Sequence, residues 1–264
     1  MNRLDKKFQE LKRSKKKAIS AFLTAGFPTV TATENLAVEL AERGVDLFEI
    51  GFPFSDPIAD GPTIQKSSEA SLRSGMSWTK LLTLSSRIRK RSQVPLVLMT
   101  YANALFCRGW EKSARDLARA GFDGIIIPDL IPEEGTDAEK VFRKAGLKLI
   151  YILAPTSSPE RIRSVARKSA GFVYCVSVTG VTGARATLPQ TEIKNFLKKV
   201  KKQASVPVLL GFGISNSGHI RAFKDSADGF IIGSALIKVL EKYRRSPSLV
   251  RQAKNFMMPL IKER

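Results

Sequence analysis

Residues 47–64, LFEIGFPFSDPIADGPTI, join a short apolar run interrupted by one glutamate to a loop rich in Pro, Gly and Asp. The run predicts a buried strand, and the loop after it carries Asp56 and Asp60. Burying a glutamate without a partner is costly, so a fold retains one only with compensation or for chemistry. Glu49 is therefore the first candidate for a catalytic acid or base.

Strands and helices alternate along the whole chain around this stretch. A short amphipathic helix marked by Leu4, Phe8 and Leu11 comes first, and eight predicted strands follow, each succeeded by helix. The predicted strands cover residues 18–25, 45–50, 95–100, 123–127, 147–152, 172–177, 206–210 and 227–232. The predicted helices cover residues 31–43, 62–73, 77–91, 110–120, 133–145, 159–168, 190–202 and 216–224, with closing helices after them. This alternation predicts an α/β fold, a single (β/α)8 TIM barrel over residues 1–264 with an extra N-terminal helix.

A weak internal repeat supports this count. Residues 44–50, 121–127 and 226–232 share a small residue, an apolar residue and an aspartate before an apolar run. In this alignment Glu49 takes the position of Ile126 and Ile231. We therefore expect Glu49 to point as a barrel-core isoleucine does, near the C-terminal strand ends where active sites of this fold lie.

The charge balance is strongly basic. The 264 residues hold 44 Lys and Arg against 24 Asp and Glu, a net charge of +20. Cationic surfaces collect phosphates, but these residues fall in separate runs beside apolar helix faces, which favours solvated helix surface over nucleic-acid binding. No apolar run is long enough to span a membrane, and residues 1–17 contain no apolar signal core, so we expect a cytoplasmic protein.

Cysteine and histidine are scarce. Cys107 and Cys175 lie far apart without a CxxC motif, and His219 is the single histidine. Neither a disulfide scaffold nor a metal site is indicated, and we expect two small buried thiols. His219 is expected on a short surface helix without a catalytic role.

Glycine-bearing turns follow the last three predicted strands, at residues 179–183, 211–215 and 232–235. Glycine allows close backbone approach to a ligand, and Ser234 opens a helix whose N–H groups point at an anion. Together the turns indicate a phosphate monoester site in the region where barrels bind phosphate. No GxxxxGK[ST] or strand-linked GxGxxG motif supports nucleoside triphosphate or dinucleotide binding.

The remaining candidates have two interpretations each. Asp60 is either an ordinary turn residue or the second carboxylate of an acid/base pair with Glu49. Four aromatic residues at or beyond strand ends either pack the barrel or sandwich a flat ligand ring. They are Phe22, Tyr101, Tyr174 and Phe212.

Several stretches together resemble one known family. Residues 48–57 with 59–62, then 99–103, 180–183 and 211–215, are similar in sequence and order to the tryptophan synthase alpha subunit family. The resemblance runs along nearly the whole chain. It implies cleavage of indole-3-glycerol phosphate to indole and glyceraldehyde 3-phosphate, a lyase reaction in tryptophan biosynthesis, without metal or organic cofactor.

The resemblance also implies residue roles. Glu49 would protonate the indole carbon that bears the side chain and help to remove the glycerol hydroxyl proton, and Asp60 would stabilise positive charge at the indole nitrogen. Thr182 would belong to a mobile loop that closes toward the aspartate. The implied indole pocket comprises Phe22, Tyr101, Ile126, Tyr174 and Phe212, and the implied phosphate site comprises Gly183, Gly213, Gly233 and Ser234.

A protein partner is implied as well. The family works with a beta subunit that consumes indole through pyridoxal phosphate in an alpha2beta2 assembly, and residues 53–60 and 103–109 resemble its docking surface. The chain departs from the family pattern at Phe27, where Asp often precedes Pro28, and in its basic charge. An acidic beta subunit that steers docking is one explanation of that charge, and it predicts strongly salt-dependent association.

Two other functions remain open from the residues alone. One is a different phosphate-binding barrel enzyme, such as an isomerase of an aminated sugar phosphate, which would require only the phosphate of the ligand. The other is a cationic binding module or a catalytically silent activator of a beta subunit, which would release no indole.

Overall fold

The structure, a computed structural model, describes residues 1–176, 190–211 and 213–264. Its strands pair in parallel in the order β5-β4-β3-β2-β1-β9-β8-β7-β6. The strands are β1 (Ala18–Thr24), β2 (Leu47–Gly51), β3 (Leu96–Met99), β4 (Gly124–Ile126), β5 (Lys148–Ile150), β6 (Ile152–Leu153), β7 (Val173–Val176), β8 (Val208–Gly211) and β9 (Gly229–Ile232).

The two ends of this order belong to one stretch of chain. Strands β5 and β6 are separated only by Tyr151, whose carbonyl oxygen accepts the N–H of Tyr174 at 3.1 Å. β5 pairs with β4, and β6 pairs with β7. The strand predicted at residues 147–152 thus closes the sheet into a parallel α/β barrel, and the predicted TIM-barrel fold is confirmed.

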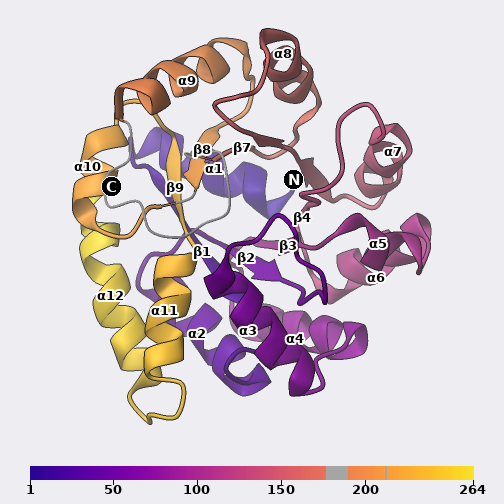
Figure 1. Cartoon of the computed structure of the whole chain (residues 1–264), viewed down its shortest axis with the longest axis vertical. Coiled ribbons are helices and arrows are strands. Elements are labelled where there is room, and N and C mark those ends of the chain that lie inside the picture. The colour runs from indigo at the N-terminus through magenta and orange to yellow at the C-terminus, as the bar shows by residue number, and fades with distance from the viewer. Residues whose placement is uncertain (177–189, 212) are drawn as a thin grey trace.

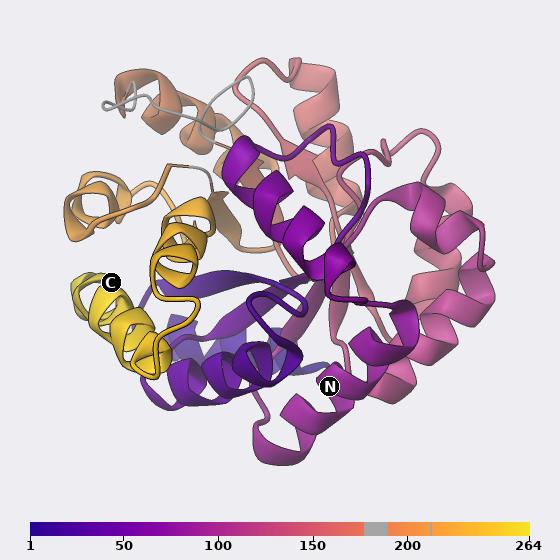
Figure 2. The ribbon, with the colours of Figure 1, turned by 60° about the horizontal axis from the view of Figure 1, so that its bottom comes forward.

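Helices surround the barrel, as Figures 1 and 2 show. They are α1 (Arg3–Arg13), α2 (Val30–Glu42), α3 (Pro62–Arg73), α4 (Trp78–Arg91), α5 (Ala102–Phe106), α6 (Trp110–Ala120), α7 (Thr136–Lys144), α8 (Pro159–Lys168), α9 (Gln190–Gln203), α10 (Ser217–Phe223), α11 (Ser234–Lys242) and α12 (Leu249–Glu263). The sequence did not predict α5, because five residues are too few for an apolar period to emerge. The helix predicted from residue 133 begins later, at Thr136.

The extra N-terminal helix closes one end of the barrel. Leu4 and Leu11 of α1 are buried and pack with Phe8 against interior residues of the strands. These residues form one cluster inside the barrel, while a second, larger cluster fills the space between the strands and the outer helices. The basic runs lie on α1, α4 and α9, whose apolar faces are buried, or beside α11.

The repeated aspartates have a structural role. Asp46, Asp123 and Asp228 each precede a strand, and a carboxylate oxygen of each accepts a backbone N–H of the neighbouring strand at 2.9 Å. The donors are, in the same order, Ile19, Leu96 and Val208. The repeat therefore places three strands in equivalent registers. Ile126 and Ile231, which occupy the positions that match Glu49, lie in the interior cluster.

Two predictions about single residues have different outcomes. Cys175 is buried as expected, but Cys107 is exposed just after α5, so the prediction of a buried thiol there is wrong. His219 lies on the short helix α10, as predicted. Within the described residues, no helix is long and apolar enough to cross a membrane.

Candidate active site

Glu49 lies inside the barrel on β2. Its neighbours across the sheet are Phe22 on β1 and Val97 on β3, and only 1% of its surface is exposed. The hydroxyl of Ser20 donates a hydrogen bond to Oε1 at 2.9 Å, whereas Oε2 is buried without a hydrogen-bond partner in the described structure. Burial raises the pKa of Glu49 to about 8, and the bond from Ser20 opposes this rise only in part. The group is therefore protonated at neutral pH and can act as a proton donor.

Asp60 lies in the loop between β2 and α3, where the chain turns over the barrel mouth. The Tyr101 hydroxyl donates a hydrogen bond to its Oδ2 at 3.1 Å and accepts the N–H of Ala59 at 2.9 Å. Phe54 stacks on the Tyr101 ring with the centroids 5.1 Å apart, which fixes the ring. Burial raises the pKa of Asp60 to about 6, and the bond from Tyr101 opposes this rise. Asp60 therefore remains mostly ionised at pH 7.

A cavity at the C-terminal ends of the strands connects Asp60 with the glycine turns. It has a volume of about 40 Å³, well below the roughly 300–1,000 Å³ of typical ligand pockets, so a substrate enters only when its lining shifts. Six of the predicted site residues line it, and Gly61, Ile64, Met99 and Ile214 complete the lining. The six are Phe22, Asp60, Tyr174, Gly213, Gly233 and Ser234.

Glu49 itself does not line this cavity but lies in the barrel beside Phe22, which does. The buried Tyr174 phenol is close enough to both carboxyl groups to feel their charges. Burial raises the pKa of Tyr174, and the charges of Glu49 and Asp60 raise it further. Both carboxyl groups thus act on one side chain of the cavity wall.

Two strand-terminal glycines make room for the aromatic rings. A Cβ at Gly51 would lie 2.4 Å from Cζ of Phe22, and one at Gly211 would lie 2.5 Å from the Tyr174 hydroxyl oxygen. Any larger residue would displace these rings from the interior. The glycines at the last positions of β2 and β8 were a sequence signal for this arrangement, although the arrangement was not predicted.

The other end of the cavity is suited to an anion. Helix α11 begins at Ser234, and its N-cap residue Gly233 has no side chain that could cap the first N–H groups. These groups have no partner within the helix, and the helix dipole favours negative charge there. Gly213, at φ +79°, lines the same cavity.

Not every predicted residue lies at the cavity. Ile126 is buried in the barrel interior opposite Met99 and does not line it. Thr182, Gly183 and Phe212 lie outside the described residues. Ser20 was not predicted as a site residue, although a serine within the otherwise apolar start of β1 was a visible signal.

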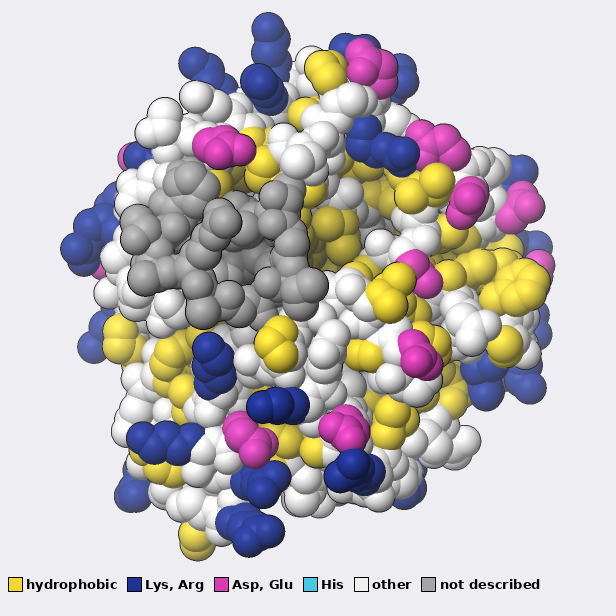
Figure 3. All heavy atoms as spheres, in the orientation of Figure 1, with side chains coloured by type: hydrophobic (Ala, Val, Ile, Leu, Met, Phe, Trp, Pro, Cys, Tyr) yellow, Lys and Arg dark blue, Asp and Glu magenta, His cyan; other side chains and the backbone are white. Residues whose placement is uncertain are grey.

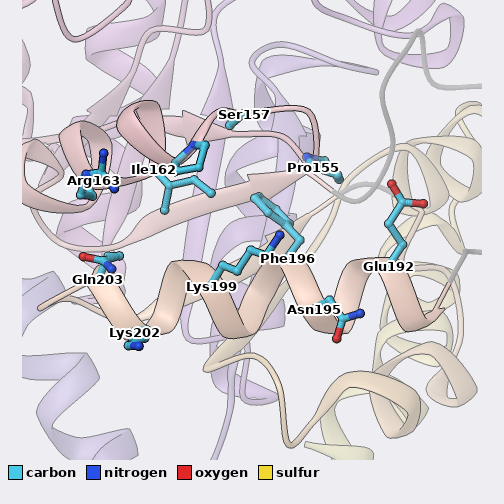
Figure 4. A pocket seen from close by; sticks show the side chains of 11 residues that line it. Pro155, Ser157, Ile162, Arg163, Glu192, Asn195, Phe196, Lys199, Lys202 and Gln203 are labelled. Carbon is cyan, nitrogen blue, oxygen red and sulfur yellow. The ribbon is translucent and has the colours of Figure 1, made fainter.

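A larger cavity elsewhere lacks the chemistry of this site. It lies between α8 and α9, has a volume of about 470 Å³, and contains Phe196 and Ile162 beside Lys199 and Arg163 (Figure 4). Glu192 is the one carboxylate among its described lining residues, and it has no acidic neighbour there. The smaller cavity carries Asp60 and lies beside Glu49, and both carboxyl groups have raised pKa values, so it is the better candidate for the active site.

The chain is similar to known proteins along nearly its whole length. The family model "Tryptophan synthase alpha chain" matches residues 8–262. The tryptophan synthase alpha chain of Geobacter sulfurreducens is 44% identical over 260 residues, covering 98% of each chain, and that of Thermoanaerobacter sp. is 42% identical with the same coverage.

Solved structures are similar to the chain as well. Tryptophan synthase subunit alpha from Legionella pneumophila is 32% identical and superimposes with a TM-score of 0.91 over 100% of this chain and 98% of that one. A chain of Mycobacterium tuberculosis tryptophan synthase is 34% identical, with a TM-score of 0.90 over 99% and 98% of the two chains. The chain therefore belongs to the tryptophan synthase alpha chain family, lyases of tryptophan biosynthesis.

Proposed function

We propose that this chain cleaves indole-3-glycerol phosphate to indole and glyceraldehyde 3-phosphate, with Glu49 and Asp60 as its catalytic carboxyl groups. Glu49 transfers its proton to the indole carbon that bears the glycerol side chain, and the ring nitrogen becomes positively charged. Asp60 stabilises that charge. The carbon–carbon bond then breaks, its electrons return to the ring, and the Glu49 carboxylate takes the proton of the adjacent hydroxyl as the aldehyde forms.

The observation that carries this proposal is the placement of two carboxyl groups in different surroundings: Glu49 is buried beside Phe22 with one hydrogen bond from Ser20, and Asp60 lines the cavity with a bond from Tyr101. The pKa of Glu49 is raised to about 8 and that of Asp60 to about 6, so one group is protonated and the other ionised near pH 7. Acid/base assignments follow from pairs of groups whose surroundings separate their pKa values. A reaction that needs a proton donor and a charge stabiliser together fits this pair.

The substrate is proposed to span the cavity between the carboxyl groups and α11. Its ring would lie among the aromatic side chains, and its phosphate would lie at the N-terminus of α11. Ring-binding residues are proposed to be Phe22, Tyr101, Ile126, Tyr174 and Phe212. Phosphate-binding residues are proposed to be Gly183, Gly213, Gly233 and Ser234, with Thr182 closing the site.

One assay tests the reaction directly. Indole release from indole-3-glycerol phosphate is measured with the purified chain, alone and with a beta subunit. Indole and glyceraldehyde 3-phosphate should appear in equal amounts, and their rate should be greatest between pH 6 and 8, where Glu49 is protonated and Asp60 ionised. Absence of indole under both conditions refutes the proposed reaction.

The acid limb of this pH profile is expected to depend on Tyr101. Tyr101→Phe removes the hydrogen bond to Asp60 Oδ2, a bond that lowers the Asp60 pKa, while the ring can still stack on Phe54. The Asp60 pKa should therefore rise, and the acid limb of kcat/KM should move up by about one pH unit, which corresponds to loss of one charge-assisted hydrogen bond. An unchanged acid limb would remove Asp60 as the group that must be ionised.

We also propose a beta subunit as the partner, in an alpha2beta2 assembly. Three large apolar side chains are exposed in the loops and the short helix after β2, β3 and β4: Ile58 at 80%, Phe106 at 70% and Ile131 at 42%. Figure 3 shows apolar side chains gathered at the edge of the face over α5. Exposed apolar patches of this kind mark protein interaction sites, and structural relatives include tryptophan synthase from Mycobacterium tuberculosis.

A charged substitution in this exposed apolar patch tests whether the patch binds a beta subunit. Phe106→Asp places a carboxylate where an apolar contact would form, and we expect binding to a beta subunit to weaken by roughly 30-fold or more. Isothermal titration measures the affinity. Lys112→Asp on α6, which also changes charge but at a polar position, is the control and should change the affinity much less.

A further inference from the structure

Ser20 differs from the other polar side chains around the active site because it lies below Glu49, within the barrel. Its side chain is fully buried, and its backbone pairs with Leu47 on β2 and Ile231 on β9. Leu47 lies two residues before Glu49 on β2, and both Leu47 and Ile231 belong to the interior cluster, so the Ser20 hydroxyl lies in an apolar layer of the barrel. A hydroxyl in this layer has few ways to satisfy its hydrogen bond, and here it bonds the Glu49 carboxyl.

The two oxygens of that carboxyl are unequal. Oε1 accepts the Ser20 hydroxyl at 2.9 Å, whereas Oε2 is buried and has no partner among the described residues. In a protonated carboxyl group one oxygen carries hydrogen and the other remains an acceptor. A serine hydroxyl that donates to Oε1 favours the form in which Oε1 is the carbonyl oxygen and Oε2 bears the proton.

We propose that Ser20 is a positioning residue of the lyase reaction: it holds Oε1 of Glu49 as a hydrogen-bond acceptor and thereby places the transferable proton on Oε2. The inference rests on the proposed role of Glu49 as the proton donor. It adds that one oxygen is fixed from inside the barrel, which leaves the other free to transfer its proton to substrate. After transfer, the same hydroxyl stabilises the carboxylate that takes up the second proton.

The surroundings of Glu49 agree with this division. Two titratable groups lie near it. One is Tyr174 on β7, whose pKa is raised by the charges of Glu49 and Asp60, and the other is Asp60, which lines the cavity. In the part of the chain that the structure describes, Ser20 is the single group that opposes the rise of the Glu49 pKa, and no cation contributes. Control of the Glu49 proton by a neighbouring side chain therefore depends on one hydroxyl.

The test compares Ser20→Ala with Ser20→Thr. Loss of the hydroxyl removes a bond to the charged form, so the Glu49 pKa should rise by about one unit and the alkaline limb of kcat should move up with it. Free rotation of the carboxyl should also lower the plateau of kcat roughly three- to tenfold, with little change in KM. Ser20→Thr retains a hydroxyl and should keep both the Glu49 pKa and the kcat plateau near the wild-type values. Ser20→Val has nearly the shape of the Thr variant but no hydroxyl, and it should behave as Ser20→Ala does.

Two controls make the result specific. Ser85→Ala on α4 also removes a buried serine hydroxyl, which donates to the carbonyl oxygen of Ala120 at 3.0 Å and is not among the described residues that line the cavity. It should lower stability to a similar extent without moving the pH profile. Infrared titration of the protonated Glu49 carboxyl, identified by its absence in Glu49→Gln, reads the pKa without any turnover.

The outcomes separate the two proposals. If indole forms and the Glu49 carbonyl band titrates identically in wild type and Ser20→Ala, the role of Ser20 is refuted while the reaction stands. If no indole forms with any variant, the reaction is refuted, and the infrared titration still reports whether Ser20 controls the carboxyl. A shifted band with normal kcat would also overturn the proposal, because proton placement would then have no catalytic effect.

Discussion

Glu49→Gln is expected to reduce kcat for indole formation by roughly 10²- to 10⁴-fold, the usual contribution of a general acid. Glutamine preserves the shape of the side chain and an oxygen that accepts the Ser20 hydroxyl, but it carries no transferable proton. KM should change little, because Glu49 does not line the described cavity. Steady-state indole release with saturating beta subunit measures both parameters.

A matched control and a stability measurement exclude trivial causes. Glu69→Gln changes an exposed carboxyl on α3 that pairs with Arg73, and it should leave kcat within about twofold because exposed pairs contribute little. Indole formation by Glu49→Gln at more than a tenth of the wild-type rate would contradict the proposed role of Glu49.

The same substitution should alter the pH dependence of folding. The folded-state pKa of Glu49 is about 8, above its ordinary value of 4.5, so between these values the folded state binds more protons than the unfolded state. Wild-type stability therefore falls as pH rises through this window, and Glu49→Gln lacks that contribution. Relative to wild type, the variant should become more stable from pH 5 to pH 8 in urea unfolding. A constant difference would show that Glu49 ionises normally in the folded protein.

The sequence was sufficient for the parts of the fold that depend on local periodicity. The spacing of Leu4, Phe8 and Leu11 predicted α1, and the repeated aspartates predicted the register that turns Glu49 into the barrel. Both predictions succeeded because helix and strand periods fix which side chains share a face.

Side-chain contacts between different strands and loops could not be predicted from local periodicity. The bond from Ser20 to Glu49 depends on how β1 and β2 pair, and the bond from Tyr101 to Asp60 depends on how a loop folds over the barrel. Cys107 was wrongly predicted to be buried because cysteine is usually buried. In the structure Cys107 is exposed, as is its neighbour Phe106. Composition reports average burial, and an exposed apolar patch departs from that average.

Asp123→Ala is expected to produce the largest loss of stability, about 3–5 kcal/mol in the free energy of unfolding, as for a buried ion pair that loses one partner. Asp123 is buried before β4, where Oδ1 accepts Arg3 at 2.9 Å, and Oδ2 accepts Arg89 at 3.0 Å and the N–H of Leu96 at 2.9 Å. The change leaves a largely buried Arg89 guanidinium without its carboxylate and releases α1, which carries Arg3, from the end of the barrel. Asp137→Ala, at an exposed pair on α7, should cost less than about 0.5 kcal/mol.

Loosening of α1 should also reach the active site, because Leu4 and Leu11 seal the interior cluster that lies beneath Glu49. Water entering from that end would solvate the carboxylate, and the Glu49 pKa would fall from about 8 toward its ordinary value of 4.5. In Asp123→Ala the alkaline limb of kcat should therefore move to lower pH, opposite to the shift expected for Ser20→Ala. Urea unfolding gives the stability, and the pH profile of indole release gives the limb. A stability loss below about 1 kcal/mol would show that the aspartate network does not hold the base of the barrel, and an unshifted limb would show that burial of Glu49 does not depend on α1.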